Sequence, residues 1–172
     1  MNDQHKITGK IINHDSSFIG DLYFNENIID IKKNNSNDFE NFILPGFIDL
    51  HCHGGNGFDV MEGSDSIERM SKYHLSHGTT SIMPTTWTNT FNDTYTALRG
   101  FNEIFNKNSN ILGIHLEGPF INPEKLGAQP NLTLKPSQEF IIKLLEVAKI
   151  KIITLAPEIK GMNEFINFLY NL

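Results

Sequence analysis

The sequence predicts an α/β protein in which parallel strands alternate with helices. Apolar, strand-like segments begin at residues 47, 79, 111 and 150, and a segment with helical periodicity follows each of them. Regular alternation at intervals of about 32 to 39 residues is typical of a parallel sheet with crossover helices. Two architectures fit this pattern: an open doubly wound sheet, and a (β/α) barrel, which needs eight units and about 250 residues.

Residues 1–44 have a different pattern, in which short apolar segments are separated by polar turns rich in Asn, Asp and Ser. This pattern predicts a small antiparallel β unit. We therefore expect two parts, an N-terminal β segment at 1–44 and a partial α/β barrel domain at 45–172. The expected strand-like segments of the first part lie at Ile7 and at residues 10–12, 18–20, 22–24 and 28–31.

The first strand of the second part is expected at residues 47–50, as a buried strand that ends in a glycine-rich segment. Because side chains alternate along a strand, Asp49, His51 and His53 share one face. Two residues along a strand span ~6.6 Å, so two imidazoles can bind one ion where the strand ends. The alternative from spacing alone is a polar loop whose histidines bind nothing.

The next helix is expected at 65–77, with Ser64 or Asp65 as its N-cap, Glu68 completing a capping box, and Gly78 ending it. The remaining elements follow in order: a strand at 79–85, a helix from about 92 that continues through 105, a strand at 111–117, a helix from 136, a strand at 150–156 and a helix containing 162–169.

The strand at 111–117 carries the second polar cluster. By alternation His115 and Glu117 share a face, and Glu117 stands at the strand's end before Gly-Pro. The ends of parallel strands converge at one mouth of a barrel, so we expect Glu117 beside His51 and His53. Two neutral imidazoles and a carboxylate suit zinc, iron or another divalent ion.

The other polar residues have simpler expectations. His115 is expected to be a hydrogen-bonded core histidine, and His74 and His77 to lie on a solvated helix face. Asp49 is expected to orient one of the histidines, with capping of a loop as the alternative. The glycines of residues 54–57 also suggest a phosphate-binding α/β module, but their spacing matches neither nucleotide fingerprint.

The composition excludes several functions. Apolar residues make up 39% and charged residues 20%, as in an ordinary globular protein. The net charge of −6 argues against binding to nucleic acid or to an anionic membrane. The single cysteine, Cys52, excludes an internal disulfide framework, and the polar start does not resemble a secretory signal. We therefore expect a cytoplasmic protein.

Four segments in order, PGFIDLHCHGG, HGTTSIMPTT, GIHLEGPFINPEKLGAQ and TLAPE, resemble the N-acetylglucosamine-6-phosphate deacetylases of the amidohydrolase superfamily. The resemblance runs from about Pro45 to the end of the chain. It implies a metal-dependent-hydrolase (β/α)8 barrel preceded by a small β-sandwich segment. It also implies hydrolysis of N-acetylglucosamine 6-phosphate to glucosamine 6-phosphate and acetate, with a metal polarising the carbonyl and activating water.

The resemblance also assigns residues. Glu117 matches the family's glutamate ligand, and His51 and His53 match the His-x-His pair of members with a second metal. Ala128 matches a position that lines the amino-sugar site. Gln129 stands where the family commonly has a histidine, and its amide is still able to hydrogen-bond sugar hydroxyls.

The family's remaining metal ligands, catalytic aspartate and main phosphate-binding residues lie beyond its fourth strand, and no position of this chain matches them. We assign no catalytic base, because no motif places Asp59 or Glu158 in that role. We expect the first four β/α units of a truncated barrel, weak metal binding and low activity of the isolated chain. A homodimer or a complementary C-terminal half is the expected partner.

Two other functions stay open. One is a different amidohydrolase, such as a dihydroorotase-like cyclic amidase, although the HLEGPF and GAQ segments argue against it. The other is a non-catalytic half-barrel fragment.

Overall fold

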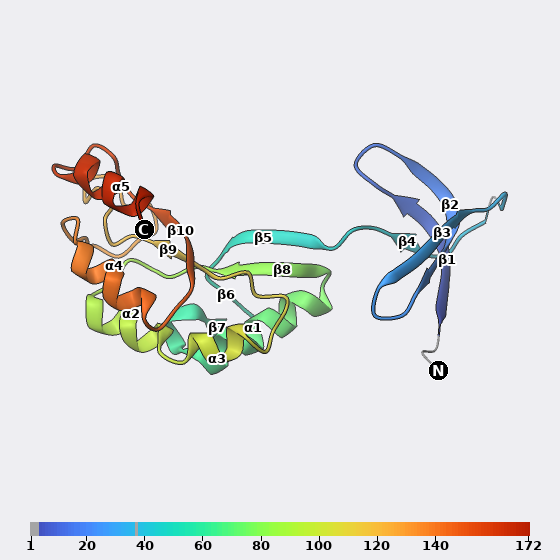
Figure 1. The fold of residues 1–172 in the computed structure, drawn as a ribbon, viewed down its shortest axis with the longest axis horizontal. Helices are drawn as coiled ribbons and strands as arrows, with labels where there is room; N and C mark the ends of the chain where they lie inside the picture. The colour runs from blue at the N-terminus through green and yellow to red at the C-terminus, as the bar shows by residue number, and fades with distance from the viewer. Residues whose placement is uncertain (1–3, 37) are drawn as a thin grey trace. The chain divides into compact units, whose positions relative to one another are not determined.

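The computed structural model describes residues 4–36 and 38–172 and divides the chain into two compact units, Met1–Gly46 and Phe47–Leu172. The first is all β, and the second combines strands with helices (Figure 1). In the described part of the chain, no helix has both the length and the apolar character needed to cross a membrane.

The first unit is a single four-stranded sheet of order β3-β2-β1-β4. The antiparallel pairs β1–β2 and β2–β3 agree with the predicted antiparallel unit, but the separate strands expected at 18–20 and 22–24 are one continuous strand, β2. The fourth strand differs, because it pairs parallel to β1 and is too short to show a periodicity in the sequence. The strands are β1 (His5–Ile12), β2 (Ser17–Phe24), β3 (Ile28–Lys33) and β4 (Phe42–Ile43).

The second unit contains four parallel strands in the order β5-β8-β9-β10. Hydrogen-bonded ladders join β5 to β8 and β9 to β10, and two isolated bridges, Ile82–Ile111 and Thr85–His115, join the middle pair. Parallel strands separated by helices agree with the predicted alternation. The strands are β5 (Phe47–Cys52), β8 (Thr79–Pro84), β9 (Ile114–Glu117) and β10 (Ile150–Thr154).

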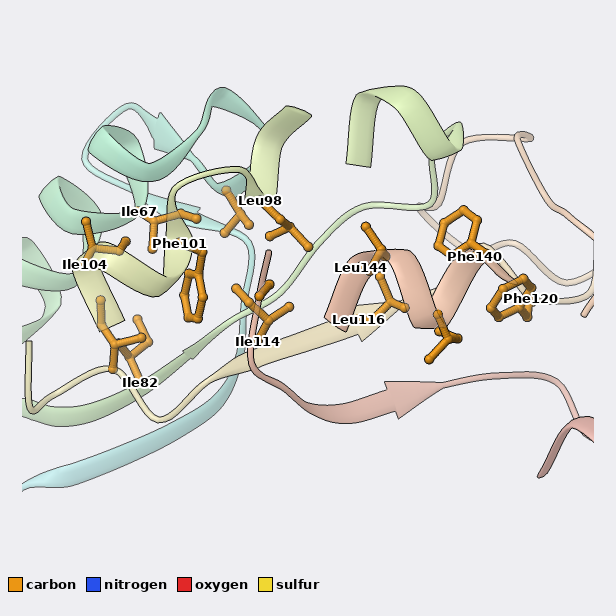
Figure 2. Close-up of a cluster of buried hydrophobic side chains, with 14 of the residues drawn as sticks. Ile67, Ile82, Leu98, Phe101, Ile104, Ile114, Leu116, Phe120, Phe140 and Leu144 are labelled. Carbon is orange, nitrogen blue, oxygen red and sulfur yellow. The ribbon is translucent and has the colours of Figure 1, made fainter. Parts of the chain in front are cut away.

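The helices of this unit pack against the strands through one apolar core. The helices are α1 (Ser64–Ser76), α2 (Phe91–Leu98), α3 (Phe101–Phe105), α4 (Gln138–Leu145) and α5 (Met162–Tyr170). Figure 2 shows Ile67, Phe101 and Leu144 from the helices facing Ile114 and Leu116 from β9. All five side chains are fully buried or nearly so, and each contributes roughly 1.5–3 kcal/mol of burial free energy.

The predicted capping box on the first helix is wrong. Helix α1 begins after Gly63 and has no side-chain cap. The capping box lies one turn earlier, on the 3-10 helix η1 (Val60–Glu62), where Asp59 and Glu62 cap each other's backbone amides. These two residues have the Asp-x-x-Glu spacing of the motif and precede Ser64 in the chain.

Two other boundaries differ from the prediction at glycines. The single helix expected from residue 92 is two helices, α2 and α3, because Gly100 adopts a left-handed conformation with φ 87°. The strand expected at 111–117 begins only at Ile114, directly after Gly113 with φ 143°. Positive φ is disfavoured for other residues, so both glycines interrupt the regular element.

Strand β5 was predicted to be buried, but it is largely exposed. Phe47, Ile48 and Leu50 are 63%, 66% and 47% exposed. In the described residues β5 pairs with β8 along one edge, and no strand pairs with its other edge. Within this unit, which is described throughout, no other segment buries these three apolar side chains.

The glycine-rich segment after β5 forms a hairpin. Strands β6 (Gly54–Gly55) and β7 (Phe58–Asp59) pair antiparallel around Asn56 and Gly57, whose φ angles are 53° and 80°. Two consecutive positive φ angles are what a type I′ turn requires, and Asn-Gly is its preferred sequence. These glycines shape a turn and do not open onto the start of a long helix, so the phosphate-binding alternative lacks its structural context.

Candidate metal centre

Three predicted residues, His51, His53 and Glu117, lie together at one end of the parallel strands. The Nε2 atom of His51 is 3.0 Å from Oε2 of Glu117 and 3.1 Å from Nε2 of His53. The Nε2 atom of His53 is also 3.0 Å from the same carboxylate oxygen. Three ligand-type atoms therefore form a nearly equilateral triangle.

The parallel topology brings these residues together. His51 lies in β5, His53 directly follows it, and Glu117 ends β9. Strand β8 lies between β5 and β9, so the carboxyl ends of all three strands lie at the same edge. The backbone contacts from Thr85 N–H to the carbonyl of Cys52 (2.8 Å) and from Thr86 N–H to that of His115 (3.0 Å) fix the register at this edge.

The tautomer of the neutral His53 ring follows from its hydrogen bond to the backbone of Thr85. Its Nδ1 atom is 3.0 Å from the backbone carbonyl of Thr85, which only accepts hydrogen bonds, so Nδ1 carries a proton. In the neutral imidazole Nε2 then presents a lone pair to the carboxylate of Glu117. Two lone pairs 3.0 Å apart repel each other unless a further proton or a cation lies near both.

The donor set fits a divalent metal. Zinc binds imidazole nitrogen and carboxylate oxygen at ~2.0–2.2 Å, which places ligand atoms of a tetrahedral site roughly 3.3 Å apart. The observed separations of 3.0–3.1 Å are close to that spacing. The side chains of His53 and Glu117 are 21% and 17% exposed, whereas that of His51 is 52% exposed. The cluster is therefore shielded on one side and accessible on the other.

His115 lies below the cluster and is a core histidine, as predicted. It is buried, and its ring nitrogens contact the hydroxyls of Thr85 (3.2 Å) and Thr154 (2.7 Å). Burial, with a smaller contribution from the neighbouring His51, lowers the pKa of His115, which favours the neutral imidazole. Its ring packs edge-to-face against His51, with the centroids 4.8 Å apart.

The prediction for His74 is wrong, whereas His77 is exposed as expected. His74 is half-buried, and its Nε2 atom is 3.0 Å from the carbonyl of Gly54 and 3.3 Å from Sγ of Cys52. Burial raises the pKa of the Cys52 thiol. The sequence places His74 on the exposed side of a helix, and only the folding back of the β6–β7 hairpin covers it.

Asp49 acts on the backbone of a histidine and not on its ring. Its Oδ1 atom accepts a hydrogen bond from the backbone N–H of His51 at 3.0 Å. Of the two predicted substrate residues, Ala128 is exposed, and Gln129 is buried with its Oε1 accepting from the backbone N–H of Thr88 at 2.7 Å. Among the described residues, neither of them hydrogen-bonds to the three clustered side chains.

The sequence reasoning missed Trp87, which stacks on His53 with ring centroids 3.8 Å apart and an interplanar angle of 14°. Trp87 follows β8 by three residues, at the same edge as the histidines. Residues just beyond the carboxyl end of a parallel strand are candidates for the functional site. The position of Trp87 in the sequence could therefore have indicated that it lies near the histidines.

Parallel strands whose carboxyl ends carry a His-x-His pair and a glutamate define a metal-dependent-hydrolase fold. Comparison with known sequences agrees: the chain belongs to the amidohydrolase family, whose profile matches residues 42–167.

Comparison with individual proteins gives more specific matches than the family profile does. The N-acetylglucosamine-6-phosphate deacetylases of Lysinibacillus sphaericus and Bacillus subtilis are 41% and 40% identical to this chain, over 68% and 69% of its length. The solved structure of N-acetylglucosamine-6-phosphate deacetylase from Thermotoga maritima matches 96% of the chain with a TM-score of 0.82 and 27% identity. The chain spans about a third of these curated relatives (32% and 33%) and 46% of the Thermotoga chain.

Proposed function

We propose that this protein takes part in the metal-dependent deacetylation of N-acetylglucosamine 6-phosphate, which yields glucosamine 6-phosphate and acetate. The observation that carries the proposal is the convergence of His51, His53 and Glu117 within 3.0–3.1 Å in a chain of the amidohydrolase family. The names of its relatives support the choice of substrate. They do not favour the cyclic-amidase alternative.

In this proposal His51, His53 and Glu117 hold the divalent metal, which is zinc or iron. When bound, the metal polarises the acetamide carbonyl and activates the attacking water. The neutral tautomer of His53, set by the carbonyl of Thr85, leaves the lone pair of Nε2 that would bind the ion. Asp49 fixes the backbone of His51 through its N–H.

Ala128 and Gln129 are proposed to lie beside the sugar. The carbonyl of the Gln129 side chain already binds the backbone of Thr88, so its NH2 group is the part available to a sugar hydroxyl. No carboxylate is proposed as the catalytic base. Asp59 is bonded to Trp87 and to the amide of Met61, and Glu158 accepts a hydrogen bond from Asn122.

We further propose that β5, β8, β9 and β10 are the first four strands of a (β/α)8 barrel. The exposed apolar side chains of Phe47, Ile48 and Leu50 support this, because unpaired apolar edges are normally covered. The partner that covers them is a complementary C-terminal half, with a second copy of the chain as the alternative. The single cysteine is consistent with a cytoplasmic location.

The test measures metal content and acetate release on the purified 172-residue chain, alone and with a polypeptide that spans the remainder of the Bacillus subtilis relative. We expect metal to co-purify weakly, acetate release to be low, and both to rise when the second polypeptide is added. The substrates compared are N-acetylglucosamine 6-phosphate, its unphosphorylated form and dihydroorotate. Turnover that is unaffected by chelator, or faster with dihydroorotate, would contradict the proposal.

A further inference from the structure

Trp87 is held in place by contacts on its face and on its edge. Its indole ring stacks on the imidazole of His53, with centroids 3.8 Å apart and planes inclined by 14°. The indole Nε1–H donates a hydrogen bond of 3.0 Å to Oδ2 of Asp59. The indole ring therefore connects His53, a predicted metal ligand, to Asp59, a carboxylate that has no role in the proposed reaction.

Asp59 is itself anchored by backbone hydrogen bonds. Its Oδ1 atom accepts from the N–H of Met61 at 2.8 Å, and its own N–H donates to Oε2 of Glu62 at 3.1 Å. The next residue, Val60, donates from its N–H to the carbonyl of His53 at 2.9 Å. His53 is therefore contacted twice: its ring by Trp87, which Asp59 binds, and its backbone carbonyl by Val60.

We propose that Trp87 is a positioning residue for His53, oriented by Asp59; the inference rests on the proposed metal site. The hydrogen bond from Nδ1 of His53 to Thr85 leaves the imidazole free to tilt about that bond. Stacking against a fixed indole removes this freedom and keeps Nε2 directed at Glu117. Residues that orient a ligand in this way typically affect metal affinity by about 10- to 100-fold.

Trp87 is also the only tryptophan in the chain, so its fluorescence reports on this position alone. A paramagnetic ion such as Co2+, held at Nε2 of His53, would be bound to the same ring on which the indole stacks. We therefore expect Co2+ to quench the emission in a saturable way, with the same midpoint as the Co2+ absorption spectrum and the calorimetric titration.

The first experiment titrates the full chain and three variants with Zn2+ and Co2+ by calorimetry. Trp87→Leu should bind about 10- to 100-fold more weakly, and Trp87→Phe, which keeps a stacking ring, should recover most of the affinity. Tyr170→Leu is the matched control, because this aromatic residue is 90% exposed, and it should bind as the wild type does. The thermal midpoint of each metal-free variant separates a local effect from unfolding.

The second experiment is a double-mutant cycle between Asp59→Asn and Trp87→Phe. The asparagine keeps one carbonyl acceptor for Met61 but loses the second acceptor, which receives the indole N–H. Asp59→Asn should weaken metal binding in the wild type by no more than Trp87→Phe does, because both remove the same hydrogen bond. It should have no further effect beside phenylalanine, which has no N–H to orient. This pair keeps the inference testable if Trp87→Leu does not fold.

The outcomes separate the two proposals. A wild-type chain that binds no metal, either alone or with the complementary polypeptide added, overturns the proposed metal site, and this inference with it. A wild-type chain that binds metal while Trp87→Leu binds it equally well overturns the positioning role alone. Equal effects of Asp59→Asn in both backgrounds would show that Asp59 does not act through the indole.

Discussion

The Nε2 atom of His51 and the Oε2 atom of Glu117 lie 3.0 Å apart, although 66 positions separate the two residues in the sequence. The contact exists because β5 and β9 run parallel on opposite sides of β8 and end at the same level. The ligand atoms of the cluster therefore come from two strands that are not adjacent in the sheet, and their spacing depends on the strand that lies between them.

Replacing Glu117 by glutamine should reduce Zn2+ affinity by more than about 100-fold, beyond the usual effect of residues that only orient a ligand. The neutral amide keeps the size of the side chain but removes the negative charge shared by both imidazoles. Calorimetric titration of the metal-free chain measures the change. Glu124→Gln, at an exposed position of the loop after β9, is the control. Equal affinities in the two variants would remove Glu117 from the site.

Gly118 should not tolerate alanine. It has φ 71°, and an added Cβ atom would overlap Oγ1 of Thr88. Relieving this contact moves either the loop after β8 or the end of β9, which carries Glu117. We expect Gly118→Ala to lower the free energy of unfolding by about 1–3 kcal/mol from backbone strain alone, and to weaken metal binding. Gly127→Ala, with φ 61° but open space around it, controls for strain without the clash. Metal affinity equal in both variants would contradict the displacement.

Two adjacent leucines on α4 should differ strongly in stability. Leu144 is fully buried in the core, whereas Leu145 is 39% exposed. Leu144→Ala should lower the free energy of unfolding by about 2–5 kcal/mol, because it removes buried methyl groups and leaves a cavity. Leu145→Ala, the matched control, should cost clearly less. Urea unfolding followed by circular dichroism measures both changes. Equal losses would show that α4 does not pack against the strands through the face that carries Leu144.

The first unit should lose stability in acid through Asp21. Hydrogen bonds from Thr8 and Lys6 lower the pKa of this carboxyl below its ordinary value of 3.8. The unfolded carboxyl therefore takes up a proton more readily than the folded one. The stabilisation that Asp21 contributes is fully present above about pH 3.8, the ordinary pKa. It is lost as the pH falls through the lower pKa of the folded state.

The matching measurement is urea unfolding of the whole chain at several pH values, followed by the NMR signals of β1 and β2. Asp21→Asn should flatten the acid dependence of these signals, and Asp15→Asn, at an exposed position between the two strands, should not. An unchanged acid dependence in Asp21→Asn would show that other carboxyls control it.

Much of this arrangement is readable from local sequence. The alternation of apolar segments and helical periodicity predicts the parallel strands, and the two-residue spacing of His51 and His53 predicts their common direction. Ser137 caps α4 as its position before an amphipathic segment indicates. The helix break at Gly100 and the late start of β9 were not predictable, because a glycine in a helical or strand pattern is compatible with both outcomes.

The sequence by itself determined which residues have the chemistry of metal ligands and in which order the strands and helices occur, because both depend on residues near one another in the chain. Only the tertiary structure decided what surrounds those ligands. The stack of Trp87 on His53, the bond of Asp59 to the indole and the burial of His74 under the hairpin all join segments whose contact depends on how the loops return to the strand ends. No periodicity in the sequence records those returns, since they are set by turn geometry and by packing between distant segments.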